Sequence, residues 1–281
     1  MADMQALLIF CEGPHDAAFT RLTFEKIFNY QRKTLCFSEF PYPFNAIFRK
    51  SVQDHVADDL RLDMARKFFL PDHVLKKDNK LLLIFNYGGS NRKASVTPFL
   101  ERLLVLHRSG QAFSGNSKAT EINFLFMADA DSIGSQRALA QISSDFSSIS
   151  EVPWITDEWQ RTNNTDGYSQ GTNKNIYAYI WKHSAHDSGT LENLIEECID
   201  LVPFLAAVDT HFQWDIVNPD RKRATAEQAK RTKAALSLMG QRSKPGSSMS
   251  VIVDQGGLLT AERLVSSQAV RALIHFLTPL A

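Results

Sequence analysis

The fold of this chain is constrained most by a short apolar run that ends in two aspartates, Asp129 and Asp131. The run begins after Glu121, and its length is typical of a strand buried on both faces of a parallel sheet. Acidic side chains belong instead at the carboxyl end of such a strand, where open α/β sheets bind their ligands. Because alternate residues of an extended chain point to one side, we expect both carboxylates to face one site.

Two carboxylates on one side form a hard-oxygen site that suits Mg²⁺ or Mn²⁺. The alternative is that Asp129 and Asp131 belong to a solvated turn, since aspartate is common in turns. The rest of the sequence favours the metal site, because an acid also follows another predicted strand.

Similar apolar runs predict three further strands. The first is followed by Glu12, Gly13 and Pro14, residue types that allow a tight turn and then start a helix. Glu12 therefore resembles Asp129 in position, unless its side chain only caps its own loop. Helical patterns separate the strands, and this alternation predicts an α/β fold with a parallel four-stranded sheet flanked by helices. The three runs occupy residues 6–11, 80–86 and 175–181.

Two more segments near predicted strand ends carry candidate residues. Gly88 and Gly89 follow a strand, and paired glycines let backbone amides approach a phosphate, although a plain turn explains them equally well. Thr190 is expected to cap a helix. Glu192 then lies in the first turn of that helix and points toward the same edge of the sheet.

The sequence divides into a core, residues 1–200, and a mostly helical extension packed on it, residues 201–281. The core contains a helical insertion at about 40–79, marked by apolar residues at helical spacing. The turn-rich segment 161–173 is expected to be a loop, and 247–253 a short edge strand.

The extension carries the strongest positive cluster of the chain. It includes Lys230 and Lys233 on a helix predicted at about 224–239. Such a cluster either contacts phosphate or forms a solvated helix face.

Composition limits the classes of function. Basic and acidic residues number 31 each, so affinity for nucleic acid must come from local clusters or a bound metal. The three cysteines are widely spaced, which argues against a disulfide framework or structural zinc site and favours a reducing cytoplasm. No apolar run approaches the roughly 18 residues that span a bilayer, so no membrane association is expected.

In their order along the chain, the strand followed by Glu-Gly, the strand followed by Gly-Gly and the strand ending in Asp-x-Asp resemble the Toprim domain. Topoisomerases, bacterial primases, recombination proteins and nucleases related to the phage-exclusion protein OLD share this Rossmann-like domain. The resemblance covers roughly residues 6–197. Residues 8–16, Leu-Ile-Phe-Cys-Glu-Gly-Pro-His-Asp, and residues 189–192, Gly-Thr-Leu-Glu, look most like stand-alone Toprim proteins and OLD-type nucleases.

The resemblance implies a divalent-metal site with Glu12 as the acid of the first strand, and a basic residue, Lys230 or Lys233, that steadies the transition state. In the hydrolysis expected of such a site, Glu12 would either ligate the ion or take a proton from the attacking water. The resemblance does not imply topoisomerase, primase or intrinsic ATPase activity, because the strand-passage tyrosine domain, zinc ribbon and ATPase module are missing from this sequence. The implied metal ligands are Glu12, Asp129, Asp131 and Glu192.

The hypothesis from the sequence is a Mg²⁺- or Mn²⁺-dependent endonuclease that cleaves DNA or RNA as the effector of a bacterial anti-phage defence system. The alternative is a non-catalytic Toprim-like module that binds nucleic acid or protein and is regulated by a partner ATPase. The zero net charge favours a restrained protein over a free nuclease. Two further possibilities stay open: the chain forms a homodimer, or it is a phosphoryl-transfer enzyme that acts on a small molecule and uses the same acids.

Overall fold

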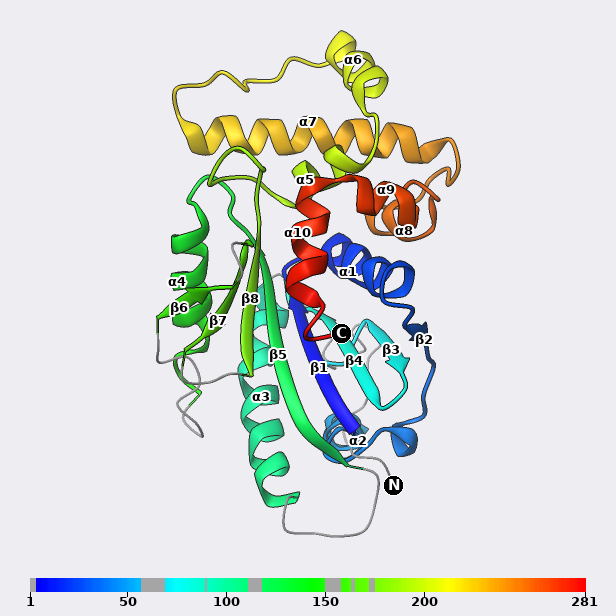
Figure 1. Cartoon of the computed structure of the whole chain (residues 1–281), viewed down its shortest axis with the longest axis vertical. Helices are drawn as coiled ribbons and strands as arrows, with labels where there is room; N and C mark the ends of the chain where they lie inside the picture. The colour runs from blue at the N-terminus through cyan, green and yellow to red at the C-terminus, as the bar shows by residue number, and fades with distance from the viewer. Residues whose placement is uncertain are drawn as a thin grey trace.

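The computed structural model describes residues 4–56, 69–88, 90–110, 118–149, 158–162, 165–171 and 175–281. Four parallel strands form the centre of the sheet (Figure 1). They coincide with the four apolar runs, because each is buried along most of its length. An α/β fold with parallel strands flanked by helices is therefore confirmed. In spatial order the four are β4 (Lys80–Asn86), β1 (Met4–Cys11), β5 (Ala119–Asp129) and β8 (Ile176–Trp181).

Antiparallel strands extend both edges, so the described part of the chain has eight strands in its sheet and the predicted number of four is wrong. The edge strands lack long apolar runs. Of the strand beside β4, only Leu75 is buried. The added strands are β2 (Gln31–Arg32), β3 (His73–Lys77), β6 (Trp159–Arg161) and β7 (Gly167–Gln170).

Two of these strands lie in segments that were expected to have other structures. β3 lies in the segment expected to be a helical insertion at about 40–79, in which α2 (Phe44–Val56) is helical and η1 (Phe37–Glu39) precedes it. Residues 57–68 of that segment lie outside the described residues. β7 lies within 161–173, which was expected to be a loop.

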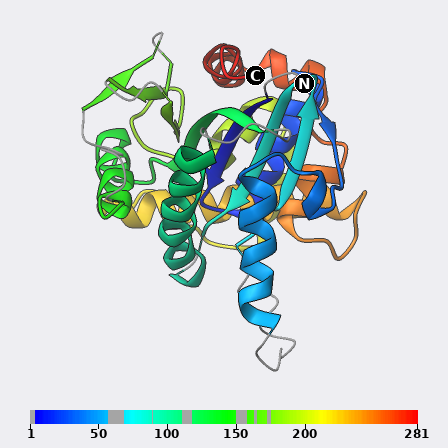
Figure 2. The same ribbon diagram turned by 90° about the horizontal axis from the view of Figure 1, so that it is seen from below.

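Alternating side chains of β1 enter two separate apolar cores. Leu7 and Ile9 belong to one core, while Leu8 and Phe10 belong to the other. Each face of the sheet is therefore covered by its own helices, as Figure 2 shows for α2, α3 and α4 on one side and α10 on the other. The first core packs on α1 (Pro14–Lys26), α5 (Leu191–Cys198) and α10 (Gln268–Leu277), the second on α2, α3 (Ser90–Gly110) and α4 (Ser135–Phe146).

The helices after residue 201 join the core of α1 and α5. Among them α7 lies across the carboxyl ends of the parallel strands and contacts α5 (Figure 1). Segment 247–253, expected to be a strand, lies mostly in α8, where Ile252 packs tightly against Gly240 of α7. Tertiary packing thus overrides the strand preference of its β-branched residues. The helices are α6 (Val202–His211), α7 (Arg221–Gln241), α8 (Met249–Gln255) and α9 (Ala261–Ser266).

In the part of the chain that the structure describes, no helix has both the length and the apolar character to cross a membrane.

The contact between β7 and α10 yields a test of the fold. A methyl group at Gly167 would overlap the ring of Phe276, which is buried. We expect Gly167→Ala to lower the free energy of unfolding by about 1–3 kcal/mol, the usual effect of overpacking. Urea denaturation measures this change. The double variant Gly167→Ala with Phe276→Leu should lose less stability than the sum of the two single variants, and strict additivity would contradict the contact.

Candidate functional site

The candidate site lies at the edge of the sheet where the parallel strands end. Asp129 is the last residue of β5, and Glu12 follows the adjacent strand β1. The Oε2 atom of Glu12 accepts a hydrogen bond from the backbone N–H of Asp129, with a distance of 3.4 Å. The two acids therefore meet at one edge, where the strand-end rule places them.

The Asp129 side chain bridges this edge to the start of α5. Its Oδ1 atom accepts a hydrogen bond from the backbone N–H of Leu191 at 2.9 Å. Burial raises the pKa of Asp129 well above its usual value, and the negative charges of Asp16, Glu192 and Glu12 raise it further. Acids from three segments are thus close enough to repel one another.

Asp131 does not follow the pattern expected of an extended chain. β5 ends at Asp129, and Asp131 has a φ of 46°, in the left-handed region. Its N–H and C=O both bond to the backbone of Gly189, and its side chain is exposed. The rule that alternate residues of an extended chain share a side therefore does not apply at Asp131, and its role as a metal ligand stays a prediction.

Glu192 is a buried carboxylate with two cationic neighbours. It is 1% exposed in the first turn of α5, and its Oε1 atom lies 3.2 Å from Nε2 of His15 and 3.3 Å from Nζ of Lys233. Burial acts to raise the pKa of Glu192, but the contacts with His15 and Lys233 outweigh it and lower the pKa to about 2. The carboxylate is therefore charged and holds α1, α5 and α7 together.

Sequence reasoning did not single out two members of this cluster, His15 and Asp16. Asp16 is 3% exposed, its Oδ1 atom has no hydrogen-bond partner, and burial raises its pKa to about 6. The contact with Glu192 raises the pKa of His15. The only local signal was their place in the first turn of the helix that follows Glu12.

The two candidate lysines have different surroundings. Lys233 contacts Glu192, whereas Lys230 is 65% exposed and pairs with Glu227 of its own helix at 2.7 Å. Two arginines of the basic cluster also pair with acids, Arg223 with Asp215 and Arg231 with Asp209. Much of the positive charge of α7 is thus neutralised within the protein.

Gly88 has a structural reason to be glycine. A Cβ atom there would overlap the backbone carbonyl oxygen of Glu12, so the loop after β4 packs directly on the end of β1. This close approach of two backbone segments requires a glycine by itself, so no bound phosphate is needed to explain Gly88. Gly89, the second glycine of the pair, lies outside the described residues.

The acids fit a divalent cation in their chemistry. Carboxylate oxygens are the ligands that Mg²⁺ and Mn²⁺ prefer. At this edge of the sheet several acids lie close together, and the buried Oδ1 atom of Asp16 has no hydrogen-bond partner. In the described residues, however, no three His, Cys, Asp or Glu side chains form a group arranged to hold a metal ion. Glu192 in particular faces His15 and Lys233 instead.

Comparisons with known proteins add little to this description. No protein-family model matches the chain, and no curated protein matches it. It is similar to the crystal structure of hypothetical protein PH0156 from Pyrococcus horikoshii OT3, with 14% sequence identity and a TM-score of 0.42, over 98% of this chain and 95% of that one.

The raised pKa of Asp16 predicts how stability depends on pH. Burial raises it from 3.8 to about 6, so the folded state binds this proton more tightly than the unfolded chain does. The contribution of Asp16 therefore lowers the free energy of unfolding as the pH rises from about 4 to about 6. We expect Asp16→Asn to flatten this decline and to raise stability at pH 7 by on the order of 2 kcal/mol.

Urea denaturation in EDTA at pH values between 4 and 7 measures the effect. Asp131→Asn, which changes an exposed aspartate near the same edge, is the matched control. An unchanged pH dependence in Asp16→Asn would contradict the raised pKa of this buried carboxyl group.

The two lysines provide a direct comparison. Lys233→Met leaves the buried charge of Glu192 with one cation fewer, while Lys230→Met removes only a surface pair. Because the Lys233 side chain is 43% exposed, solvent screening limits the expected loss to about 1–2 kcal/mol. We expect a change of about 0.5 kcal/mol or less for Lys230→Met. Thermal and urea denaturation at pH 7 measure the stability of both variants. Equal losses of stability would contradict the contact between Lys233 and Glu192.

Proposed function

We propose that this chain is a divalent-cation-dependent nuclease that hydrolyses phosphodiester bonds of nucleic acid. The observation that supports the proposal is the group of acids from β5, α5 and the β1–α1 segment that meet at one edge of the sheet. Asp16 and Asp129 both have raised pKa values there. Burial is the main cause of both shifts, and the negative charge of neighbouring acids adds to it. A bound cation would offset the contribution of those charges.

Glu12, Asp16 and Asp129 would hold the cation, because the remaining acid of the cluster, Glu192, already contacts two cationic side chains. Mg²⁺ or Mn²⁺ held by these residues would supply a bound water of lowered pKa and positive charge beside the phosphate. Glu12 is exposed at the edge, where its carboxylate is able to accept a proton from an attacking water.

Glu192 would act as a positioning residue. Its carboxylate fixes the imidazole of His15 and the ammonium of Lys233 beside the acids. Lys233 is partly exposed, so its ammonium group would approach a phosphate oxygen of the substrate and stabilise the charge that develops there. Lys230 has no comparable position, since it pairs with Glu227 on the surface.

The second candidate is a non-catalytic module that binds nucleic acid or protein under the control of a partner ATPase. One observation favours it: the described acids do not form a group arranged to hold a metal. The neutralised basic residues of α7 also suit a protein with weak intrinsic affinity for nucleic acid. For both candidates, we propose that the protein acts as the effector of an anti-phage defence system and is kept inactive until needed.

Cleavage assays test the nuclease. Purified protein is incubated with plasmid DNA and with total RNA in Mg²⁺ or Mn²⁺, beside Asp129→Asn and the exposed control Glu262→Gln. We expect Asp129→Asn to lower the rate by about a hundredfold or more, as removal of a group that stabilises the transition state does. Glu262→Gln should cleave at the original rate. If Asp129→Asn cleaved as fast as the original protein, Asp129 would not be part of a catalytic site.

Calorimetric titration with Mn²⁺ separates the two candidates. A nuclease site should bind Mn²⁺ in the original protein and lose binding in the Asp16→Asn, Asp129→Asn double variant. Near-UV circular dichroism of the double variant checks that the fold is retained. An absence of Mn²⁺ binding to either protein favours the non-catalytic module.

A further inference from the structure

The segment from α6 to the start of α7 exposes a large share of the apolar side chains at the surface. Across the described ranges, eight large apolar side chains are exposed, and four of these lie within residues 202–217. Such a concentration is typical of an interaction surface, whereas single exposed apolar residues are normal. The four are Val202, Phe212, Ile216 and Val217, which are 70%, 58%, 39% and 89% exposed.

This segment lies at one end of the molecule. α6 packs on the side of α7 that faces away from the sheet, and the chain then runs back along α7 to the start of that helix (Figure 1). Within α6 only Leu205 and Val208 are buried. The outer side of the segment is therefore open to solvent.

Polar contacts hold the segment in a defined conformation. Asp209, near the end of α6, accepts two hydrogen bonds from the guanidinium group of Arg231, at 2.7 and 2.6 Å. In the following loop, the carboxylate of Asp215 lies 3.0 Å from the guanidinium group of Arg223. The exposed apolar side chains thus project from a fixed scaffold, which lowers the entropy cost of binding a partner.

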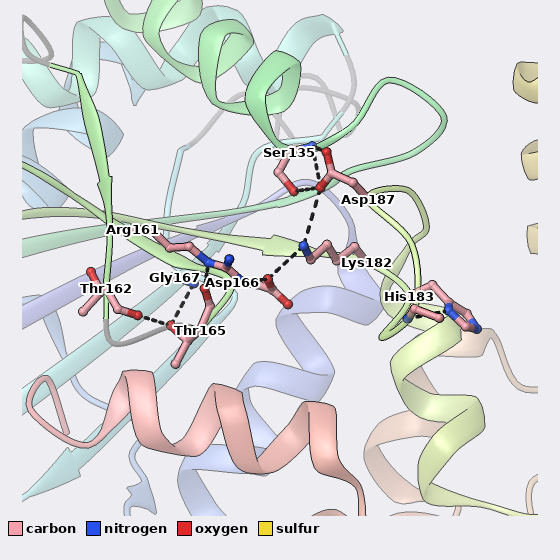
Figure 3. Close-up of polar contacts among 10 residues, drawn as sticks. Ser135, Arg161, Thr162, Thr165, Asp166, Gly167, Lys182, His183 and Asp187 are labelled. Carbon is pink, nitrogen blue, oxygen red and sulfur yellow. Dashed lines mark hydrogen bonds and ion pairs between the residues drawn. The ribbon is translucent and has the colours of Figure 1, made fainter.

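The same contacts favour a partner without a large net charge, because they pair two acids of the segment with two arginines of α7. Charges elsewhere on the surface are also paired within the chain. Arg161 and Lys182 both contact Asp166, and Lys182 also contacts Asp187 (Figure 3). The formal net charge of the whole chain is zero, so long-range repulsion does not oppose the approach of two copies.

We propose that a second copy of this chain binds to this surface and forms a two-fold symmetric dimer. The exposed parts of the four apolar side chains amount to roughly 400 Å² in each copy, since a side chain of this size presents on the order of 150–200 Å². Homodimer interfaces are about 65% apolar, so burial of both patches implies a total interface of about 1,200 Å². That area reaches the lower limit of specific protein interfaces.

Two-fold symmetry supplies a complementary surface without a second patch, because the same residues serve on both copies. Phe212 offers an aromatic anchor, since its ring packs on Trp214 with 5.7 Å between the centroids. Val217 is the most exposed of the four and would lose the most contact with water. No residue of the acidic edge takes part, so the dimer is independent of the proposed function.

Analytical ultracentrifugation of the full chain tests the proposal. An interface of this size is expected to dissociate in about the micromolar range, so the mass should rise reversibly from one chain to two as the concentration increases. Val217→Asp should raise the dissociation constant more than about tenfold, because two-fold symmetry places two charges in the apolar interface. Phe212→Asp should have the same effect.

Val265→Asp is the matched control. It makes the same substitution at a valine of α9 that is 45% exposed and lies outside the segment, so it should dimerise as the original protein does. Far-UV circular dichroism checks that each variant is folded.

Hydrogen exchange locates the interface without any substitution. The backbone amides of residues 212–217 should exchange more slowly in concentrated than in diluted original protein, whereas those of α9 should not change. An increase in NaCl concentration should not weaken the dimer, because the ion pairs of the segment form within each copy.

Several outcomes would overturn the proposal. These are a single-chain mass at every concentration, a dimer that both Val217→Asp and Phe212→Asp leave intact, or equal weakening by Val265→Asp. A single-chain protein that binds phosphatidylglycerol vesicles through Val217 would assign the surface to a membrane instead. Asp129→Asn should still dimerise, so loss of cleavage in that variant and loss of the dimer are separate results.

Discussion

The arrangement of the site depends on one buried carboxylate, that of Glu192. A charged group that is 1% exposed is strongly unfavourable unless it is paired, and its partners, His15 and Lys233, come from opposite ends of the chain. This contact joins the helix after β1, the helix after β8 and the long helix of the extension. A second polar contact, from the hydroxyl group of Thr232 to Glu196 at 3.4 Å, also joins α7 to α5.

The contact of Glu192 with His15 and Lys233 divides the acids into two kinds. Glu192 contacts two cationic side chains and its pKa is lowered, whereas the pKa values of the buried Asp16 and the partly buried Asp129 rise through burial and the negative charge of nearby acids. Acids whose pKa values are raised by burial and by one another reduce stability at neutral pH, which is a common property of functional sites. This group of acids is also the part of the molecule that would gain most from a cation.

The sequence predicts the centre of the fold and part of the site, for physical reasons. Strands buried on both faces must be continuous apolar runs, so β1, β4, β5 and β8 are evident, but short edge strands carry no such requirement. Glu12 and Asp129 follow from the strand-end rule. Asp131 does not, because the backbone leaves the extended region after β5. The choice between Lys230 and Lys233 depends on how α7 is rotated against α5, a tertiary contact that local patterns do not encode.

The central claim is that acids from distant segments share one cation at this edge. Anomalous diffraction from a crystal soaked in Mn²⁺ tests it most directly. The expected result is a single strong peak bordered by the carboxylates of Glu12, Asp16 and Asp129, with Glu192 still beside His15. An absence of anomalous density at this edge in a saturated crystal, or a peak on an unrelated surface, would contradict the claim.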